Sequence, residues 1–281
     1  MAGSPFRALL RAALYIVLTV PLMPVQAALI LARSRFIGRF PRFYHRLSCR
    51  VLGIELRLLG KISPTHPTLF VANHISYLDI EVMGAAIDGC FVAKREVARW
   101  PFFGWLAKLQ RTVFIDRRVS RVHVERDEVA RRLEAGDNLI LFAEGTSSDG
   151  THLRPFKSSL LSVAERNVAH EPLVVQPVTL AYTRLDGMPI GRQWRPFFGW
   201  YGDMEMLPHL WTVIGLGRIT AELQFHAPVT LAALGSRKAL ADHCERVIGD
   251  GLSRANSGRL ATAPSQPTPA TPQPFAAEAA S

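Results

Sequence analysis

The sequence predicts an α/β fold, a mixed sheet flanked by helices, preceded by an N-terminal membrane-embedded helical segment. Between about residues 52 and 230, short apolar runs rich in β-branched and aromatic residues alternate with helical patterns, as in a sheet covered by helices. Residues 12–32, AALYIVLTVPLMPVQAALILA, carry no charge and have about the length that crosses a bilayer. Hydrophobic residues make up 48% of the 281, which is enough to fill a sizeable core.

The apolar segment is interrupted by Pro21 and Pro24. These prolines allow a kinked span or a shallow helical hairpin that enters and leaves the membrane on one side. A cleaved signal peptide is the alternative, because Arg7 and Arg11 precede the apolar core and VQA at 25–27 resembles a cleavage site. Arginines crowd the C-terminal flank, which argues against export and places that flank in the cytoplasm by the positive-inside rule. They are Arg33, Arg35, Arg39, Arg42, Arg46 and Arg50.

An amphipathic basic helix is expected next. The last five of these arginines recur at steps of four, three, four and four, and phenylalanines interleave with them at positions 36, 40 and 43. This spacing predicts a helix that lies in the membrane interface with its arginines toward lipid phosphates. An ordinary solvated basic helix is the alternative.

The charge balance indicates an anionic partner. Lys and Arg number 33 against 23 Asp and Glu, which gives a formal charge of +10. Because the arginines adjoin the apolar segment, and no stacking-aromatic motif of an RNA-binding module is present, we expect a bilayer with anionic lipids and no nucleic acid. Three widely spaced cysteines without a CxxC motif argue against a disulfide framework or a zinc site. We therefore expect the inner (cytoplasmic) membrane, with the main domain facing the cytoplasm.

The elements of the main domain follow in order. Amphipathic helices are expected at 120–135, where Gly136 stops the pattern, and at 157–168. The aromatic stretch 197–217 is too broken for a membrane span, and we expect a lid or groove wall there. The strand candidates are LRLL, TLFVA, CFVA, TVFI, LILFA, LVVQPVTLAY and ITAELQF.

The chain accordingly divides into three parts. Residues 1–50 form a membrane anchor with the basic interfacial helix, and residues 51–257 form the main domain. Residues 258–281 are rich in proline and alanine and should be disordered.

One strand candidate ends on polar residues that a core strand does not need. TLFVA at 68–72 is followed by Asn73 and His74, and Asp79 comes five positions after the histidine. Ser76 and Asp79 have the spacing of a capping box. A helix starting there would put His74 at the carboxyl end of a strand, where α/β proteins commonly keep their chemistry. A carboxylate beside an imidazole fixes its tautomer and stabilises the imidazolium, so the pair is a candidate general base.

Three further segments accompany this pair: TVFIDR at 112–117, LFAEGTSSDG at 141–150 and VVQPVTLAY at 174–182. Each is an apolar strand that ends in residues able to bind an anion or shape a pocket. Together with NHxxxxD, this ordered set resembles the glycerolipid acyltransferase family, typified by 1-acyl-sn-glycerol-3-phosphate acyltransferase. The resemblance covers about residues 50–230.

The resemblance implies a role for each matching residue. His74 would be the general base, with Asp79 as its orienting partner. The donor would be acyl-CoA or acyl carrier protein, with no further cofactor or metal, because a thioester is already activated toward a lysolipid hydroxyl. Pro177 would line the donor side, and Lys94 would be another anion contact. The acceptor-binding residues would be Arg117, Glu144, Gly145 and Thr146.

One position departs from the family pattern. Members acting on lysophosphatidic acid commonly carry arginine after EGT, and this chain has Ser147. Arg154 or Lys157 could hold the acceptor phosphate instead. Alternatively the acceptor is lyso-ornithine lipid, which has a free 3-hydroxyl and no phosphate, since EGTSSDG and WYGDMEMLPHLW resemble that bacterial branch. We rank lysophosphatidic acid, which gives phosphatidic acid, slightly ahead.

Other classes fit less well. A serine hydrolase would need GxSxG, and the second glycine of GTSSDG comes one position too late. A metal hydrolase would need a third ligand beside His74 and Asp79, and the sequence has no HExxH. A non-enzymatic membrane scaffold would account for the charge but would leave the four motifs unexplained.

Overall fold

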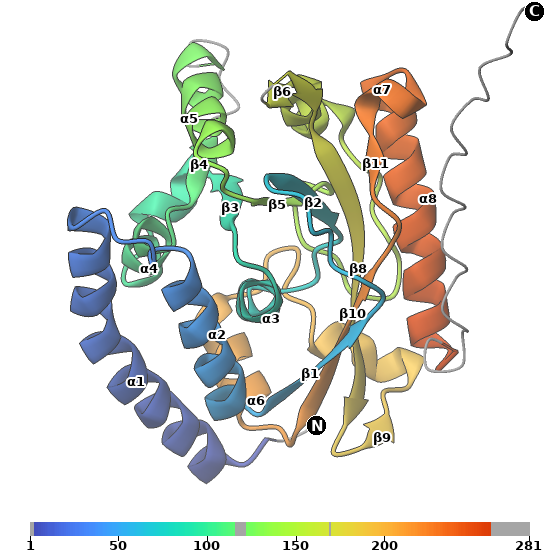
Figure 1. The fold of residues 1–281 in the computed structure, drawn as a ribbon. Coiled ribbons are helices and arrows are strands. Elements are labelled where there is room, and N and C mark those ends of the chain that lie inside the picture. The colour runs from blue at the N-terminus through green and yellow to red at the C-terminus, as the bar shows by residue number, and fades with distance from the viewer. Residues whose placement is uncertain (1–2, 116–121, 169, 260–281) are drawn as a thin grey trace, which may run out of the picture.

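A computed structural model describes residues 3–115, 122–168 and 170–259 and contains one mixed sheet between helical layers (Figure 1). Across the sheet the order is β1-β10-β8-β2-β5-β3-β4. All seven strand candidates are confirmed, and they form β1 (Ile54–Leu59), β2 (Thr68–Ala72), β3 (Cys90–Lys94), β4 (Val113–Ile115), β5 (Leu139–Phe142), β8 (Val174–Leu185) and β10 (Ile219–Phe225). Short strands β9 (Met188–Pro189) and β11 (Val229–Thr230) pair with β8, and β6 (Asn167–Val168) pairs with β7 (Glu171–Pro172).

The parallel centre of this sheet positions the polar motifs. Strand β2 pairs in parallel with both β5 and β8, and all five of its residues are buried. Burial on both faces explains why its sequence is continuously apolar. Ala72 lies opposite Phe142, so the segments that follow β2 and β5 leave the sheet at the same edge.

Helices cover both faces of the sheet (Figure 1). One apolar cluster joins the sheet to α2 (Arg39–Leu52), α3 (Leu78–Ala86) and α6 (Met206–Ile214). A second joins the other face to α5 (Val122–Glu134), the 3₁₀ helix η3 (Ser158–Glu165) and α8 (Arg237–Asn256). The remaining helices of the described residues are α1 (Pro5–Leu31), η1 (Arg95–Arg99), α4 (Phe103–Leu109), η4 (Arg192–Phe197) and α7 (Leu231–Leu234).

Helix α1 runs without interruption through Pro21 and Pro24. A hairpin inside residues 12–32 is therefore wrong, because the chain reverses only after α1 and returns as α2, beside which α1 lies (Figure 1). By length and composition, α1 could cross a membrane.

Hydrogen bonds hold α1 against the main domain along its length. Near the start of α1, Arg11 donates hydrogen bonds to the carbonyl oxygens of residues 214, 216 and 217, at the end of α6 and just after it. In the middle, the Tyr15 hydroxyl bonds Glu81 of α3 at 3.1 Å, and near the end the Gln26 amide donates to the Leu109 carbonyl of α4 at 3.0 Å. The opposite side of α1 exposes apolar side chains, including Phe6, Leu9, Val17, Val20 and Leu31.

Three sequence expectations are refined. Within residues 157–168, the chain forms the 3₁₀ helix η3 and then β6 rather than one α-helix. The expected basic helix is α2. Its Arg46 faces the protein rather than only lipid, because Arg46 Nε donates a hydrogen bond to the Ala85 carbonyl of α3 at 3.0 Å. The stretch 197–217 includes α6, one side of which faces the interior. The tail from residue 260 onward lies outside the described residues.

Candidate active site

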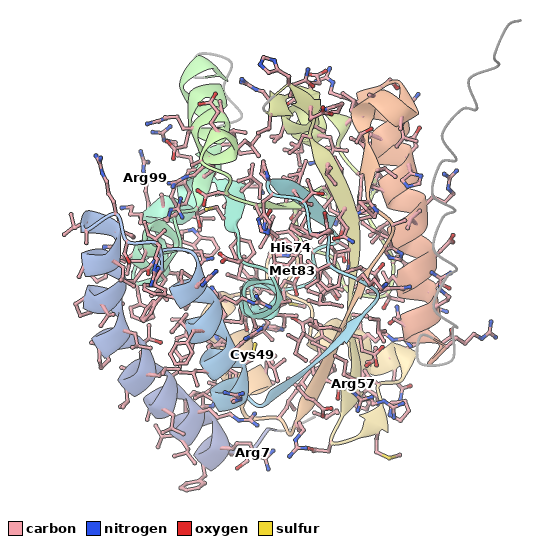
Figure 2. The ribbon with its side chains drawn as sticks, in the orientation of Figure 1. Arg7, Cys49, Arg57, His74, Met83 and Arg99 are labelled. Atoms are coloured by element: carbon pink, nitrogen blue, oxygen red, sulfur yellow. The ribbon has the colours of Figure 1, made fainter. Side chains whose placement is uncertain are left out.

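His74 and Asp79 meet as the sequence predicted. His74 Nδ1 lies 2.7 Å from Asp79 Oδ2. Because a carboxylate oxygen only accepts, the proton of a neutral imidazole is on Nδ1, and Nε2 keeps its lone pair for a substrate. The Asp79 side chain is fully buried and the His74 side chain is 20% exposed, so the pair opens toward the exterior only through the imidazole. His74 lies near the centre of the molecule in Figure 2.

Backbone contacts fix His74 between two segments. Its N–H donates to Glu144 Oε1 at 2.7 Å, and its carbonyl accepts from both the N–H and the hydroxyl of Ser148, at 2.8 and 3.0 Å. Its ring stacks on Phe142 with centroids 4.2 Å apart and planes 13° from parallel. The loop after β5 therefore supports the histidine that follows β2.

Asp79 is held by four hydrogen-bond donors. Besides His74, its Oδ2 accepts from the N–H groups of Ile75 and Ser76 at 2.6 and 3.0 Å, and its Oδ1 accepts from the hydroxyl of Tyr182 at 2.8 Å. These donors fix the carboxylate in the position from which it orients the imidazole. Tyr182 ends the third accompanying motif, but its hydroxyl was missed, because strand alternation alone does not reveal a partner on another strand.

The predicted capping box forms only in part. Helix α3 begins at Leu78 with Tyr77 before it, and the Ser76 hydroxyl accepts from Leu78 N–H at 3.4 Å rather than from Asp79. The reverse bond, from Ser76 N–H to the Asp79 carboxylate, is present. With the same oxygen, Asp79 therefore accepts a hydrogen bond from the backbone just before α3 and orients His74.

Glu144 lies behind His74 rather than in the open site. The side chain is buried, and its two oxygens accept from the backbone N–H groups of His74 and Arg154, at 2.7 and 2.8 Å. Burial raises the pKa of Glu144 to about 7, the two backbone hydrogen bonds oppose this shift, and the nearby charge of Asp79 adds to it. The structure thus gives Glu144 a positioning role, while its predicted acceptor contact stays a prediction.

Except for Arg117, the other predicted acceptor residues lie in or near the turn that follows β5. Gly145 adopts φ +69°, a conformation that favours glycine, and a Cβ there would lie 3.3 Å from Lys157 Nζ. Thr146 and Lys157 are exposed near this turn. Arg117 lies outside the described residues.

Two other named residues also have clear positions. Lys94 is exposed at the end of β3, whereas Pro177 is buried in β8 opposite Val71 and does not line the cavity described below.

Ser147 connects the site to the aromatic stretch. Its side chain is buried, and its hydroxyl donates to the Trp200 carbonyl. Trp200 N–H in turn donates to the carbonyl of Ile75 at 2.9 Å, one residue from His74. The position where an arginine was expected thus holds a loop in place, and sequence reasoning found the position but not this contact.

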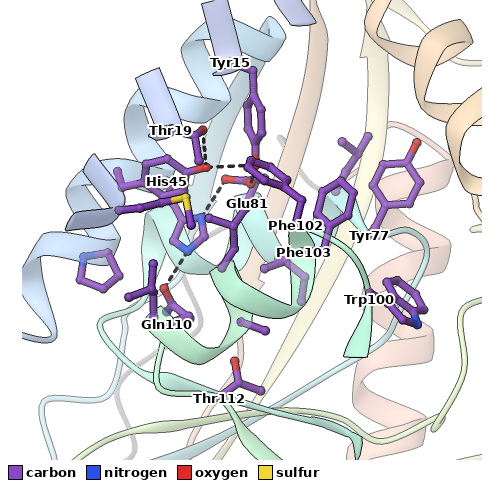
Figure 3. Close-up of a pocket in the computed structure, with 18 of the residues that line it drawn as sticks. Tyr15, Thr19, His45, Tyr77, Glu81, Trp100, Phe102, Phe103, Gln110 and Thr112 are labelled. Atoms are coloured by element: carbon purple, nitrogen blue, oxygen red, sulfur yellow. Dashed lines mark hydrogen bonds and ion pairs between the residues drawn. The ribbon is translucent and has the colours of Figure 1, made fainter. Parts of the chain in front are cut away.

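A large apolar cavity lies beside the site. Its volume is about 620 Å³, within the range of ligand pockets, and Figure 3 shows part of its lining. Residues of α1, α2, α3, β3, η1, α4 and α6 form most of its wall. The expected groove wall at 197–217 is borne out by Met206, Leu207, Leu210 and Ile214, all of α6.

Aromatic side chains connect the cavity to His74. Although His74 does not line the cavity, Phe142 stacks on its ring, and Phe91, which does line the cavity, stacks on Phe142 with centroids 6.2 Å apart. The Trp200 ring also lies 5.9 Å from the rings of Tyr77 and Trp100, two lining residues. The cavity therefore comes within two side chains of the candidate base.

Comparisons with known proteins agree with this arrangement. The profile of the acyltransferase family matches residues 53–181. A lyso-ornithine lipid O-acyltransferase of Brucella abortus (strain 2308) is 42% identical over 264 residues, covering 92% of this chain and 98% of that protein. A 1-acyl-sn-glycerol-3-phosphate acyltransferase of Neisseria gonorrhoeae is 33% identical over 201 residues, covering 70% and 73%. The crystal structure of the 1-acyl-sn-glycerophosphate acyltransferase PlsC from Thermotoga maritima has the same fold, with a TM-score of 0.63 at 21% identity over 89% of this chain and 96% of that one.

Proposed function

The chain belongs to the glycerolipid acyltransferase family of lysolipid O-acyltransferases, and we propose that its acceptor is lyso-ornithine lipid. The His74–Asp79 pair supplies the base that such a transfer needs. Nε2 of His74 removes the proton from the acceptor hydroxyl as the hydroxyl oxygen attacks the thioester carbonyl carbon. The carbon–sulfur bond then breaks, and the departing thiolate takes the proton from the imidazolium. The products are an ester and a free thiol, with no covalent enzyme intermediate.

The acceptor is inferred chiefly from Ser147. An arginine at this position could hold a phosphate with two hydrogen bonds, but here the side chain is buried and bonded to the Trp200 carbonyl. An acceptor without a phosphate needs no such arginine. The 42% identity to a protein named lyso-ornithine lipid O-acyltransferase supports the same choice. Lysophosphatidic acid, which we ranked slightly ahead from the sequence, is the second candidate because Lys157 is exposed next to Gly145.

We place the protein on the cytoplasmic face of the inner membrane, with α1 embedded along the surface rather than crossing it. Arg11, Tyr15 and Gln26 tie α1 to the domain at its start, middle and end. These contacts support a helix that stays against the domain and buries its exposed apolar side in lipid. The cavity behind α1 is suited to an acyl chain, because apolar side chains form most of its wall. The donor is a thioester of coenzyme A or of acyl carrier protein.

Acyl transfer in isolated membranes tests this proposal. Membranes that contain the wild type or His74→Ala would receive labelled acyl-CoA or acyl carrier protein together with lyso-ornithine lipid or lysophosphatidic acid. We expect histidine-dependent ornithine lipid to exceed phosphatidic acid at least tenfold. Histidine-dependent phosphatidic acid alone would reverse the acceptor assignment, and equal products from both variants would exclude His74 as the base.

A further inference from the structure

A second pair of histidine and carboxylate side chains lies beside the cavity (Figure 3). His45 Nδ1 of α2 lies 2.7 Å from Glu81 Oε2 of α3, and the two side chains are only 6% and 12% exposed. The other ring nitrogen of His45 lies 3.0 Å from Oε1 of Gln110, the residue that follows α4. The Tyr15 hydroxyl of α1 donates to Glu81 Oε1 at 3.1 Å. Polar contacts therefore connect α3 to three neighbouring elements through Glu81.

Glu81 and Asp79 lie on opposite sides of α3. Two residues along an α-helix turn the side chain by about 200°. Asp79 faces His74, whereas Ile80 and Glu81 line the cavity. Atoms that border a cavity lack packing partners on that side. The cavity side of α3 is therefore held less by apolar packing, and the hydrogen bonds of Glu81 hold it instead.

The His45 ring also fits directly against the backbone of α3. A Cβ at Gly84 would lie 2.3 Å from Cδ2 and 2.7 Å from Nε2 of His45, so the ring occupies space that only a glycine leaves open. Gly84 comes about one helical turn after Glu81. The ring contact and the hydrogen bond to Glu81 together fix the rotation of α3 about its axis.

We propose that His45 and Glu81 are positioning residues for acyl transfer, which hold α3 so that Asp79 meets the imidazole of His74. This inference rests on the proposed function, because it gives the two residues a part in orienting the base of that reaction. A rotation of α3 would carry Asp79 Oδ2 away from His74 Nδ1, from which it now lies 2.7 Å. His45 and Glu81 act through the helix and take no part in the bond-making steps.

Steady-state kinetics would compare Glu81→Gln with a matched control. The glutamine keeps the shape of the side chain but replaces the carboxylate that holds His45. We expect kcat to fall at least about tenfold with little change in KM, because misplacing a reacting group by about 1 Å can cost about 100-fold in rate. Thr179→Val is the control, since the buried Thr179 hydroxyl bonds His226 and the Ile248 carbonyl of α8 on the other face of the sheet. This variant should lower the melting temperature and leave kcat unchanged.

Proton NMR of the detergent-solubilised protein would follow the position of Asp79 without requiring acyl transfer. The proton on His74 Nδ1 lies in a short hydrogen bond to a carboxylate and should resonate well downfield of ordinary N–H protons. Its absence from His74→Ala identifies the signal. We expect Glu81→Gln to move or broaden it and Thr179→Val to leave it in place. Tyr15→Phe removes one hydrogen bond to Glu81 but keeps the ring, so it should move the signal in the same direction by less.

The possible results separate the two proposals. A His74 signal that stays in place in Glu81→Gln, or that moves equally in Thr179→Val, would overturn the positioning role. If Glu81→Gln does not fold, an unmoved signal in Tyr15→Phe would overturn it in the same way. A wild-type protein that transfers no acyl chain to any lysolipid, but whose signal moves in Glu81→Gln, would refute the proposed function and leave the positioning of Asp79 standing.

Discussion

The hydroxyl of Tyr182 donates a hydrogen bond of 2.8 Å to Asp79 Oδ1, on the side of the carboxylate away from His74. Tyr182 is almost completely buried, and both burial and the charge of Asp79 raise the pKa of its phenol. The phenol therefore stays protonated and remains a donor over the whole working pH range. The strand β8 thus contributes to the orientation of a histidine that follows β2.

Tyr182→Phe should slow acyl transfer without abolishing it. The phenylalanine keeps the packing but leaves Asp79 with donors on one oxygen only, and a hydrogen bond to a charged group contributes about 1.5–3 kcal/mol. We expect kcat to fall about tenfold while KM changes little, because the acceptor and donor contacts stay in place. Steady-state kinetics would measure both constants. Wild-type kcat in a variant of unchanged thermal stability would remove Tyr182 from the catalytic arrangement.

His74→Ala should lose nearly all transfer, and Asp79→Asn should lose less. General-base catalysis contributes about 10²–10⁴ in rate, and His74→Ala removes the base itself. In Asp79→Asn the base is kept, and the asparagine fills the same space but can turn either its amide oxygen or its amide nitrogen toward the imidazole. Because Asp79 Oδ2 also accepts from the N–H groups before α3, Asp79→Asn should also lower the melting temperature. Circular dichroism beside the assay separates the two effects. An Asp79→Asn loss larger than that of His74→Ala would contradict the assigned roles.

Ser147→Arg should reduce ornithine lipid synthesis at least about tenfold. The longer side chain cannot fit where Ser147 is buried against Trp200, so the loop that holds Trp200 beside Tyr77 and Trp100 must move. Ser147→Ala removes only the hydrogen bond and is the matched control, for which we expect a loss of a few-fold. A Ser147→Arg protein that keeps its ornithine lipid activity and gains phosphatidic acid synthesis would mean that position 147 faces the acceptor directly.

Glu144 should make stability depend on pH in a defined direction. Its folded pKa of about 7 lies above the ordinary value of 4.5. The stabilisation of the folded state by Glu144 is therefore fully present below about pH 4.5 and is lost as pH rises through 7. Relative to Glu144→Gln, which cannot titrate, the wild type should lose up to about 3 kcal/mol between these limits.

Melting temperatures of both proteins at pH 5 and pH 8 would measure this difference. Glu165→Gln, which changes an exposed glutamate, is the control. A gap between wild type and Glu144→Gln that stays constant with pH would show that Glu144 is ionised throughout.

The sequence predicted the strands well because each is a short run rich in apolar and β-branched residues, and it placed His74 and Asp79 correctly because their spacing is local. Contacts between segments could not be predicted in the same way. The hydroxyl of Tyr182 reaches Asp79 across 103 residues, and Ser147 bonds a carbonyl 53 residues away. Helix α1 was placed at the membrane from its composition, but its ties to the domain depend on Arg11 and Tyr15, whose partners lie far along the chain.

Both ends of α1 should lie on the cytoplasmic side of the membrane. The three native cysteines are buried, so single cysteines introduced at the exposed positions Ser4 and Ala32 can be labelled selectively. A membrane-impermeant maleimide should label neither site in intact spheroplasts and both in inside-out vesicles. Because Arg11 binds the chain just after α6 and Gln26 binds α4, we expect the same pattern at the two positions. Labelling of Ser4→Cys from the periplasmic side, with Ala32→Cys labelled from the cytoplasmic side, would instead make α1 a transmembrane helix.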